Sequence, residues 1–496
     1  MSLTDRPAAG SDRAADAEVH WVMHLRFDAS GTRPDDIGEL VRKAGGWLQG
    51  ASPLASNETQ PTWRYKLAAN TIHGSQLIVA MIWKLPGVDV LRTTDATFGT
   101  HLGGKIEIRN KTSVETQSDL TAAYTPGFAH VASVIADDAE QVWRLSMKHN
   151  TVAIVTDGSA VSGLGNLGPH AALPVMEGKA LVFKAFADID AFPICLASQD
   201  VDEIVRTVTL MEAGFGAIML EDIAGPRCFE IEERLRETLH IPVFHDDQHA
   251  TAVAATAALI NAAKLVKKTP SELKVVIVGA GAAGASAARL FTQIGIENII
   301  VCDRGGALHR GRDGLNKYKR WLAERTNPMQ LSGPARSVLV GADVLLGLSG
   351  PGFVTVRDIE RMAPDPIVFA LANPDPGLYP DEVESRVAVF ATGRSDYPNQ
   401  VDSGLCYPGI FRGALDCRAR AINEDMKLAA ARAIAGMVAP GQLSKRHILP
   451  RIFDGVAHEV AREVSQAARR AGLAAVHSSM YSLNANEAHD DGGPTQ

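Results

Sequence analysis

Two pairs of adjacent acidic residues carry the clearest chemistry in the sequence. Glu221 and Asp222 end the apolar stretch GAIMLED, and Asp246 and Asp247 end the stretch IPVFHDD. Neighbouring carboxylates repel each other. Burying them away from water costs further free energy unless a cation or hydrogen-bond donors offset the charge. Clustered oxygen ligands select Mg²⁺ or Mn²⁺, whereas zinc favours nitrogen or sulfur. The pairs therefore indicate a divalent-cation site; the alternative is that these acids cap the helices that follow them.

A glycine-rich turn provides a second signal. In LKVVIVGAGAAGASAARLFTQIG, residues 273–295, a β-branched strand leads into Gly279, Gly281 and Gly284, with Ala282 and Ala283 between the last two, and then into a helix. Such glycines let a pyrophosphate approach the helix N-terminus, where N–H groups and the helix dipole favour anions. The pattern predicts a dinucleotide-binding site.

The next strand, NIIVCD, ends at Asp303, which can accept the ribose hydroxyls of the nucleotide. A carboxylate there repels a 2′-phosphate and so favours NAD over NADP. Arg304, Arg310 and Arg312 weaken this preference, because an arginine can pair with that phosphate. NAD is the expected acceptor, and NADP remains an alternative.

The elements around these residues indicate how they are positioned. Between residues 150 and 247, strands alternate with helices, which predicts βαβ crossovers and a parallel sheet whose ligands bind beyond the carboxyl ends of the strands. Both acidic pairs fall at that end of consecutive strands. Further strands are expected within 342–352 and 366–376, the latter placing Asn373 where it could contact a substrate carboxylate or form a turn.

We therefore predict an α/β protein with several parts. Residues 19–98 read β-α-β-β-α-β, an order typical of ferredoxin-like modules, and residues 424–475 are expected to be helical. The expected division is a disordered tail at 1–18, an α+β module at 19–98, a parallel-sheet catalytic domain at 99–249, a Rossmann-type domain at 250–430, C-terminal helices at 431–476 and a disordered tail at 477–496.

Composition excludes several classes of function. With 46% hydrophobic residues, 21% charged residues and a net charge of −8, the chain is typical of a globular protein without affinity for nucleic acid. Its five scattered cysteines lack CxxC spacing, which argues against a disulfide framework or a thiolate zinc site. An N-terminus without an apolar segment, and no run of 18 apolar residues, predict a cytoplasmic protein with no membrane contact.

From about Gly103 to Gly472 the chain resembles bacterial malic enzymes, which decarboxylate malate oxidatively to pyruvate with NAD(P) and Mg²⁺ or Mn²⁺. The resemblance is carried by AAYTPG, VTDGSAVSGLGNLGP, LPVMEGKALVFKAF, IPVFHDDQHAT, VGAGAAG, FALANPDP and YPGIFRGALD. The N-terminal module resembles the ACT-like modules of some members, which implies a small-molecule effector. Membership also implies a homodimer or a higher homo-oligomer.

The resemblance assigns roles to matching residues. It implies Glu221, Asp222 and Asp247 as metal ligands, Lys179 as general base, Tyr124 as general acid and Asp246 as the partner of the lysine. A lysine beside a metal and partly desolvated can be neutral near pH 7, as a base must be.

One departure from the family concerns the substrate. Members usually carry Asn-Asn where this chain has Asp402 and Ser403, and one of those amides touches the substrate carboxylate. Ser403 is therefore a candidate substrate contact. Asn373, at its strand end over the nicotinamide side, is a candidate contact for both the substrate and the cofactor. An acid or a short hydroxyl in place of those amides would weaken malate binding or admit another group, so one alternative is a relative acting on a different or substituted 2-hydroxy diacid. Another is a catalytically silent nucleotide-binding regulator, although the retained Lys179, Tyr124 and acidic residues argue against it.

Overall fold

A computed structural model of the protein describes residues 19–28, 31–55, 60–69, 72–372, 375–395 and 397–475. Both predicted tails and Asn373 lie outside these residues. The chain forms two units, Met1–Glu107 with Ser395–Pro398, and Ile108–Arg394 with Asn399–Gln496. Among the described residues, none of the helices combines the length and apolar character needed to cross a membrane.

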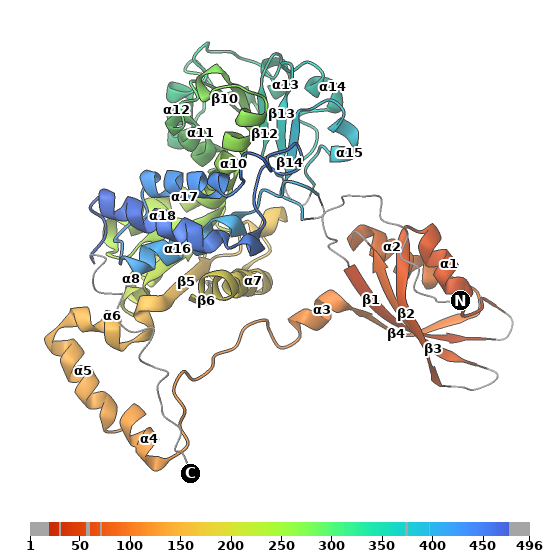
Figure 1. Ribbon diagram of the computed structural model, residues 1–496, viewed down its shortest axis with the longest axis horizontal. Helices are drawn as coiled ribbons and strands as arrows, with labels where there is room; N and C mark the ends of the chain where they lie inside the picture. The colour runs from red at the N-terminus through yellow and green to blue at the C-terminus, as the bar shows by residue number, and fades with distance from the viewer. Residues whose placement is uncertain are drawn as a thin grey trace. The chain divides into compact units, whose positions relative to one another are not determined.

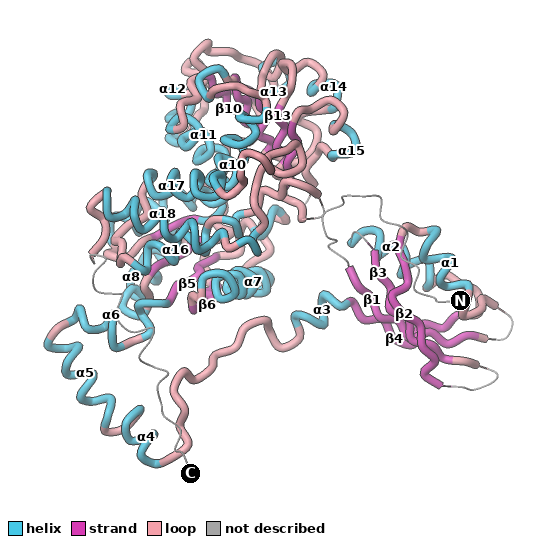
Figure 2. The backbone as a smooth tube through the Cα atoms, viewed as in Figure 1, coloured by secondary structure: helices cyan, strands magenta, loops and turns pink. Residues whose placement is uncertain are grey.

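The first unit is an α+β fold built on an antiparallel sheet in the order β2-β3-β1-β4. Its inward side chains alternate along the strands, as for Met23, Leu25 and Phe27, and they pack against Ile37 and Val41 of α1. Figure 2 shows the four strands side by side with α1 and α2. The β-α-β-β-α-β order is the one that the sequence predicted. Its elements are β1 (Val19–Phe27), α1 (Asp36–Lys43), β2 (Gly46–Ala55), β3 (Thr62–Ala69), α2 (Ile72–Ile82) and β4 (Val88–Asp95), followed by α3 (Ala96–His101).

The second unit contains a four-stranded parallel sheet in the order β6-β5-β7-β8. Helices connect successive strands, which confirms the predicted alternation. In the register of β7 and β8, Leu220 lies opposite His245, so the acidic pairs that follow these two residues leave the sheet side by side. The elements are β5 (Thr151–Thr156), α7 (Pro169–Ala187), β6 (Asp190–Cys195), α8 (Val201–Met211), β7 (Ala217–Leu220), α9 (Arg227–Thr238) and β8 (Val243–His245).

The same unit contains a six-stranded sheet in the order β11-β10-β9-β12-β13-β14, in which only β10 and β11 pair antiparallel. This is the strand order of a Rossmann domain. Its two faces bury separate clusters, one with α11 and one with α13, α14 and α15. Figure 1 shows α11 on one side of the strands and α14 and α15 on the other. The elements are β9 (Lys274–Val278), α11 (Ala282–Gln293), β10 (Asn298–Asp303), β11 (Gly306–Ala307), α12 (Lys317–Arg325), α13 (Ala335–Val338), β12 (Val344–Gly347), α14 (Val356–Ile359), β13 (Ile367–Ala370), α15 (Pro380–Val383) and β14 (Val389–Thr392).

The long helix α10 (Asp246–Leu265) runs from the end of β8 towards β9 and is buried along most of its length. Its alanines belong to one core with residues of both parallel sheets. Helices α4 (Gln117–Ala123), α5 (Gly127–Asp137) and α6 (Val142–Leu145) precede β5 in this unit, and three further helices follow β14. The predicted helical segment 424–475 is divided between the last two because Pro440 and Gly441 interrupt it. These helices are α16 (Tyr407–Asp416), α17 (Glu424–Gly436) and α18 (Val456–Arg470).

The glycine turn before α11 depends on a close backbone approach. Gly279 has a φ of 132°, and a Cβ added to Gly284 would lie 1.8 Å from the carbonyl oxygen of Gly279. No side chain fits at Gly284 without movement of the turn. The turn therefore holds the helix N-terminus against the end of β9.

We expect Gly284→Ala to lower the free energy of unfolding by about 1–3 kcal/mol, because the added methyl group forces the backbone of the turn apart. Gly436→Ala is the matched control, since nothing lies within 4 Å of its added Cβ at the end of α17. It should leave stability unchanged or raise it slightly, because alanine favours helices. Urea unfolding measures both, and an equal loss in the two variants would contradict the assignment.

Candidate active site

The two acidic pairs converge at the carboxyl ends of β7 and β8. Glu221 and Asp222 are 3% and 2% exposed. One oxygen from each of Glu221, Asp222 and Asp247 lies within 4.8 Å of the other two. The structure thus brings together the three residues that the resemblance gave as metal ligands. We call them the three-acid group.

Several oxygens of these acids have no hydrogen-bond partner although they are buried. They are Glu221 Oε2, Asp222 Oδ2 and Asp246 Oδ1. Burial, followed by repulsion from neighbouring acids, raises the pKa of Glu221 well above its usual range and that of Asp222 to about 7. Asp246 and Asp247 do begin α10, but no side chain caps that helix. Capping therefore leaves the buried oxygens unexplained, whereas a divalent cation fits this donor set.

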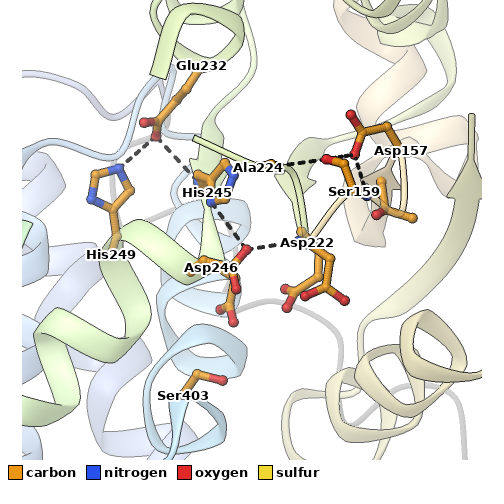
Figure 3. A network of polar contacts seen from close by, with 12 residues as sticks. Asp157, Ser159, Asp222, Ala224, Glu232, His245, Asp246, His249 and Ser403 are labelled. Carbon is orange, nitrogen blue, oxygen red and sulfur yellow. Dashed lines mark hydrogen bonds and ion pairs between the residues drawn. The ribbon is translucent and has the colours of Figure 1, made fainter. Parts of the chain in front are cut away.

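Hydrogen bonds hold the loops that carry Asp222. Its backbone N–H donates to Asp247 Oδ2 at 2.8 Å, and its own Oδ1 accepts from the backbone of Ser162 at 3.0 Å. Beside it, the Ser159 hydroxyl donates to Asp157 and accepts from the backbone N–H of Ala224 (Figure 3). The Asp157 carboxylate also accepts from Arg227 at 2.9 Å. The sequence prediction missed this support, although its residues lie in the strings VTDGS and PRCF.

Lys179, on α7, lies against these acids. Its Nζ is 2.6 Å from Asp246 Oδ2 and 3.2 Å from Glu221 Oε1. Burial lowers the pKa of Lys179, but the attraction of Asp246 and Glu221 outweighs burial and raises that pKa well above its usual range. The sequence prediction envisaged a neutral lysine beside a cation. Asp246 and Glu221 favour the charged form of Lys179, and a cation bound by the three-acid group would oppose their effect.

The departure at Asp402 and Ser403 has a clear structure. The Asp402 carboxylate accepts from the backbone N–H of Gly404 at 2.6 Å and from Gln400 at 2.9 Å, so it closes the turn before α16. Ser403 Oγ lies 3.1 Å from Lys179 Nζ and accepts a hydrogen bond from it. Asp402 therefore stabilises the turn, and Ser403 contacts Lys179.

The residues expected to bind the nucleotide lie around the glycine turn and the end of β10. Asp303 accepts from Arg312 at 2.6 Å, from Lys319 at 2.7 Å and from the backbone N–H of Gly305 at 2.8 Å. Both carboxylate oxygens are thus engaged by cations, and Lys319 was not predicted. Arg304 is exposed. The charge of Asp303, which was expected to repel a 2′-phosphate, is offset.

Tyr124, the expected general acid, has no described contact with the three-acid group. It is 64% exposed at the end of α4 (Gln117–Ala123), and its ring contacts Phe128 of α5 (Gly127–Asp137). Neither helix has a buried residue. Among the contacts described for Tyr124, none joins it to Lys179 or to the three-acid group.

The chain matches two family models, the malic enzyme N-terminal domain over residues 103–236 and the malic enzyme NAD-binding domain over residues 248–379 and 385–469. It is 48% identical over 459 residues to an NAD-dependent malic enzyme of Geobacillus stearothermophilus, covering 92% of this chain and 96% of that one. It is 50% identical over 376 residues to a bifunctional malic/malolactic enzyme of Bacillus subtilis, covering 75% and 92%.

Solved structures agree with these matches. The crystal structure of an NAD-dependent malic enzyme from Thermotoga maritima superposes with a TM-score of 0.72 at 44% identity, covering 75% of this chain and 99% of that one. The malic enzyme of Entamoeba histolytica gives a TM-score of 0.75 at 38% identity, covering 77% and 82%.

We expect Asp247→Asn to weaken Mn²⁺ binding at least about tenfold, because it removes one anionic ligand while an amide oxygen can keep the bond from the Asp222 backbone. Asp402→Asn is the matched control, since its amide oxygen can still accept from Gly404 and it lies outside the three-acid group. The paramagnetic resonance signal of free Mn²⁺ measures both affinities. Equal weakening by the two substitutions would argue against the three-acid group as the ligand set.

Proposed function

The chain belongs to the malic enzyme family, and we propose that it oxidises malate to pyruvate and CO₂ with reduction of NAD, in a reaction that requires Mg²⁺ or Mn²⁺. The observation that carries this proposal is the position of Lys179, which hydrogen-bonds Asp246 and Ser403 and pairs with Glu221 of the three-acid group. A buried amine beside oxygen ligands for a cation suits removal of a proton from a hydroxyl.

Each group then has a role. Glu221, Asp222 and Asp247 would hold the cation, which when bound polarises the substrate oxygen and stabilises the enolate that forms as CO₂ leaves. Lys179 would accept the proton of the C2 hydroxyl, and a nucleotide bound at the glycine turn would accept the hydride. Asp246, 2.6 Å from its ammonium group, orients the lysine. The Ser403 hydroxyl also holds the lysine in place, which is the role we propose for it.

The nucleotide is proposed to bind at the glycine turn before α11, with Asn373 as a further contact on the nicotinamide side. NAD is the proposed acceptor, as in the relative from Geobacillus stearothermophilus. Because Arg312 and Lys319 offset the charge of Asp303, this carboxylate repels a 2′-phosphate less strongly, and the assay should include both NAD⁺ and NADP⁺.

Two further features remain proposals. The first unit shares its strand order with ferredoxin-like modules, which supports an ACT-like role in binding a small-molecule effector. All five cysteines are free, which supports a reducing compartment such as the cytoplasm.

We also propose that the protein works as a homo-oligomer in which a second copy supplies Tyr124. A general acid must approach the carbon that it protonates, but Tyr124 is exposed at the end of α4, and neither α4 nor α5 has a buried residue. Leu120, Phe128 and Val131 of these helices are also exposed. So are Leu173 and Leu181 of α7, the helix that carries Lys179. Two copies related by a twofold axis could cover both surfaces and bring each tyrosine to the other's lysine.

The reaction is tested with malate, Mn²⁺ and either NAD⁺ or NADP⁺, followed by nucleotide absorbance and CO₂ release. We expect turnover above about 1 s⁻¹. Asp247→Asn should abolish it while NADH binding persists, and Asp402→Asn should retain it. Turnover below that rate on malate, with faster oxidation of a substituted 2-hydroxy diacid, would instead favour the alternative substrate.

The origin of the tyrosine is tested with hybrid oligomers. Tyr124→Phe and Lys179→Ala should each lower turnover at least about a hundredfold. When the two variants are co-expressed with different tags and purified as a hybrid dimer, one site regains an intact lysine and an intact tyrosine. Turnover should therefore return to about half of the wild-type value.

Hybrids as inactive as both parents would show that Tyr124 does not act across the interface. Light scattering at the assay concentration provides a second check, because a monomer with full activity would contradict the proposal.

A further inference from the structure

A buried polar network outside the substrate site is centred on His249, in the first turn of α10. His249 is 4% exposed and lies two residues after Asp247. Its Nε2 is 2.8 Å from Glu232 Oε1 of α9, and Figure 3 shows Glu232 between His245 and His249. Its Nδ1 is 3.0 Å from Ser286 Oγ of α11 and 3.0 Å from Lys427 Nζ of α17. One imidazole therefore joins four helices.

The protons of this network are well defined. The Glu232 carboxylate only accepts, so Nε2 of His249 carries the proton and donates it. Nδ1 then accepts from Lys427 or Ser286. Lys427 is 1% exposed and also pairs with Glu424 at 2.8 Å.

Buried charged groups cost free energy unless each has a hydrogen-bond or ion-pair partner. Because these partners come from different helices, the network fixes the positions of the helices relative to one another. Two of these helices begin at the functional sites. Helix α10 starts with Asp246 and Asp247, and α11 starts at the glycine turn, with Ser286 about one turn further on. Ser286 is the residue of α11 whose side chain contacts His249.

We propose that His249 and Ser286 are positioning residues that couple dinucleotide binding to divalent-cation binding. This inference rests on the proposed function, because it takes the three-acid group as the cation site. A pyrophosphate at the start of α11 fixes this helix against α10, and the bond from Ser286 to His249 transmits that restraint to the turn that carries Asp247. By linkage, each ligand then tightens the binding of the other by the same factor.

The experiment measures the dissociation constant of Mn²⁺ on the full chain, with and without saturating NADH, from the resonance signal of free Mn²⁺. In the wild-type protein, NADH should tighten Mn²⁺ binding at least about fivefold. In Ser286→Ala, NADH should change the Mn²⁺ dissociation constant by less than about twofold. Mn²⁺ affinity without NADH should stay near the wild-type value, because Lys427 still donates to Nδ1 of His249.

Thr292→Ala is the matched control. It removes a hydroxyl from the same helix, but Thr292 Oγ1 bonds only the backbone of Ala288 among the described contacts. This variant should keep the wild-type factor. NADH binding followed by fluorescence, with and without Mn²⁺, should give the same factor for each protein, as linkage requires. A purely structural role for Ser286 would instead weaken Mn²⁺ binding in the absence of NADH.

The outcomes separate the two proposals. Mn²⁺ binding that depends on Asp247 but not on NADH would overturn the coupling and leave the cation site intact. Retention of the full factor in Ser286→Ala, or its loss in Thr292→Ala, would also overturn it. Mn²⁺ binding that is absent, or insensitive to Asp247→Asn, would overturn the cation site and the coupling together.

Discussion

The concentration of negative charge at the ends of β7 and β8 is the constraint on which the site depends. Parallel pairing of β7 and β8 brings Glu221 and Asp222 together with Asp246 and Asp247, and all of these except Asp247 are buried. Lys179 offsets part of this charge through Asp246 and Glu221, but buried oxygens of Glu221 and Asp222 keep no partner. Such an arrangement is costly unless a cation offsets the charge, and hydrogen bonds hold the surrounding loops in place.

That support comes from residues with no direct part in the chemistry. Ser159 and Arg227 hold Asp157 on one side of Asp222, and the Glu232 carboxylate holds His249 on the other side of β8. Because the acids repel one another, small displacements would separate them. The rigid loops and the buried network therefore keep the oxygens close enough to share one cation.

Much of this could be predicted from the sequence, because it follows from local patterns. Strand and helix alternation fixed the parallel sheet, and strand ends followed by Glu221, Asp222, Asp246 and Asp247 indicated where the acids meet. The partners of Asp303 were not foreseen, since Arg312 was expected to pair only with a 2′-phosphate and Lys319 approaches from the helix after β11. The contact between His249 and Lys427 joins residues 178 positions apart, and no local pattern indicates such a pair. The exposure of Tyr124 was likewise unforeseen, because a motif specifies a residue type and not its surroundings.

The helix α10 begins directly after β8 and leads through residues 266–273 to β9 of the next sheet. Its alanine surface is shared by residues of both sheets, including Val152 of β5 and Val275 of β9. The catalytic and nucleotide-binding parts thus lack a boundary at which the chain could be cut cleanly. A fragment ending near this helix would expose small apolar side chains that normally face the other half. The two parts are consequently better regarded as one folding unit with two sheets than as modules that evolution or protein engineering could exchange independently.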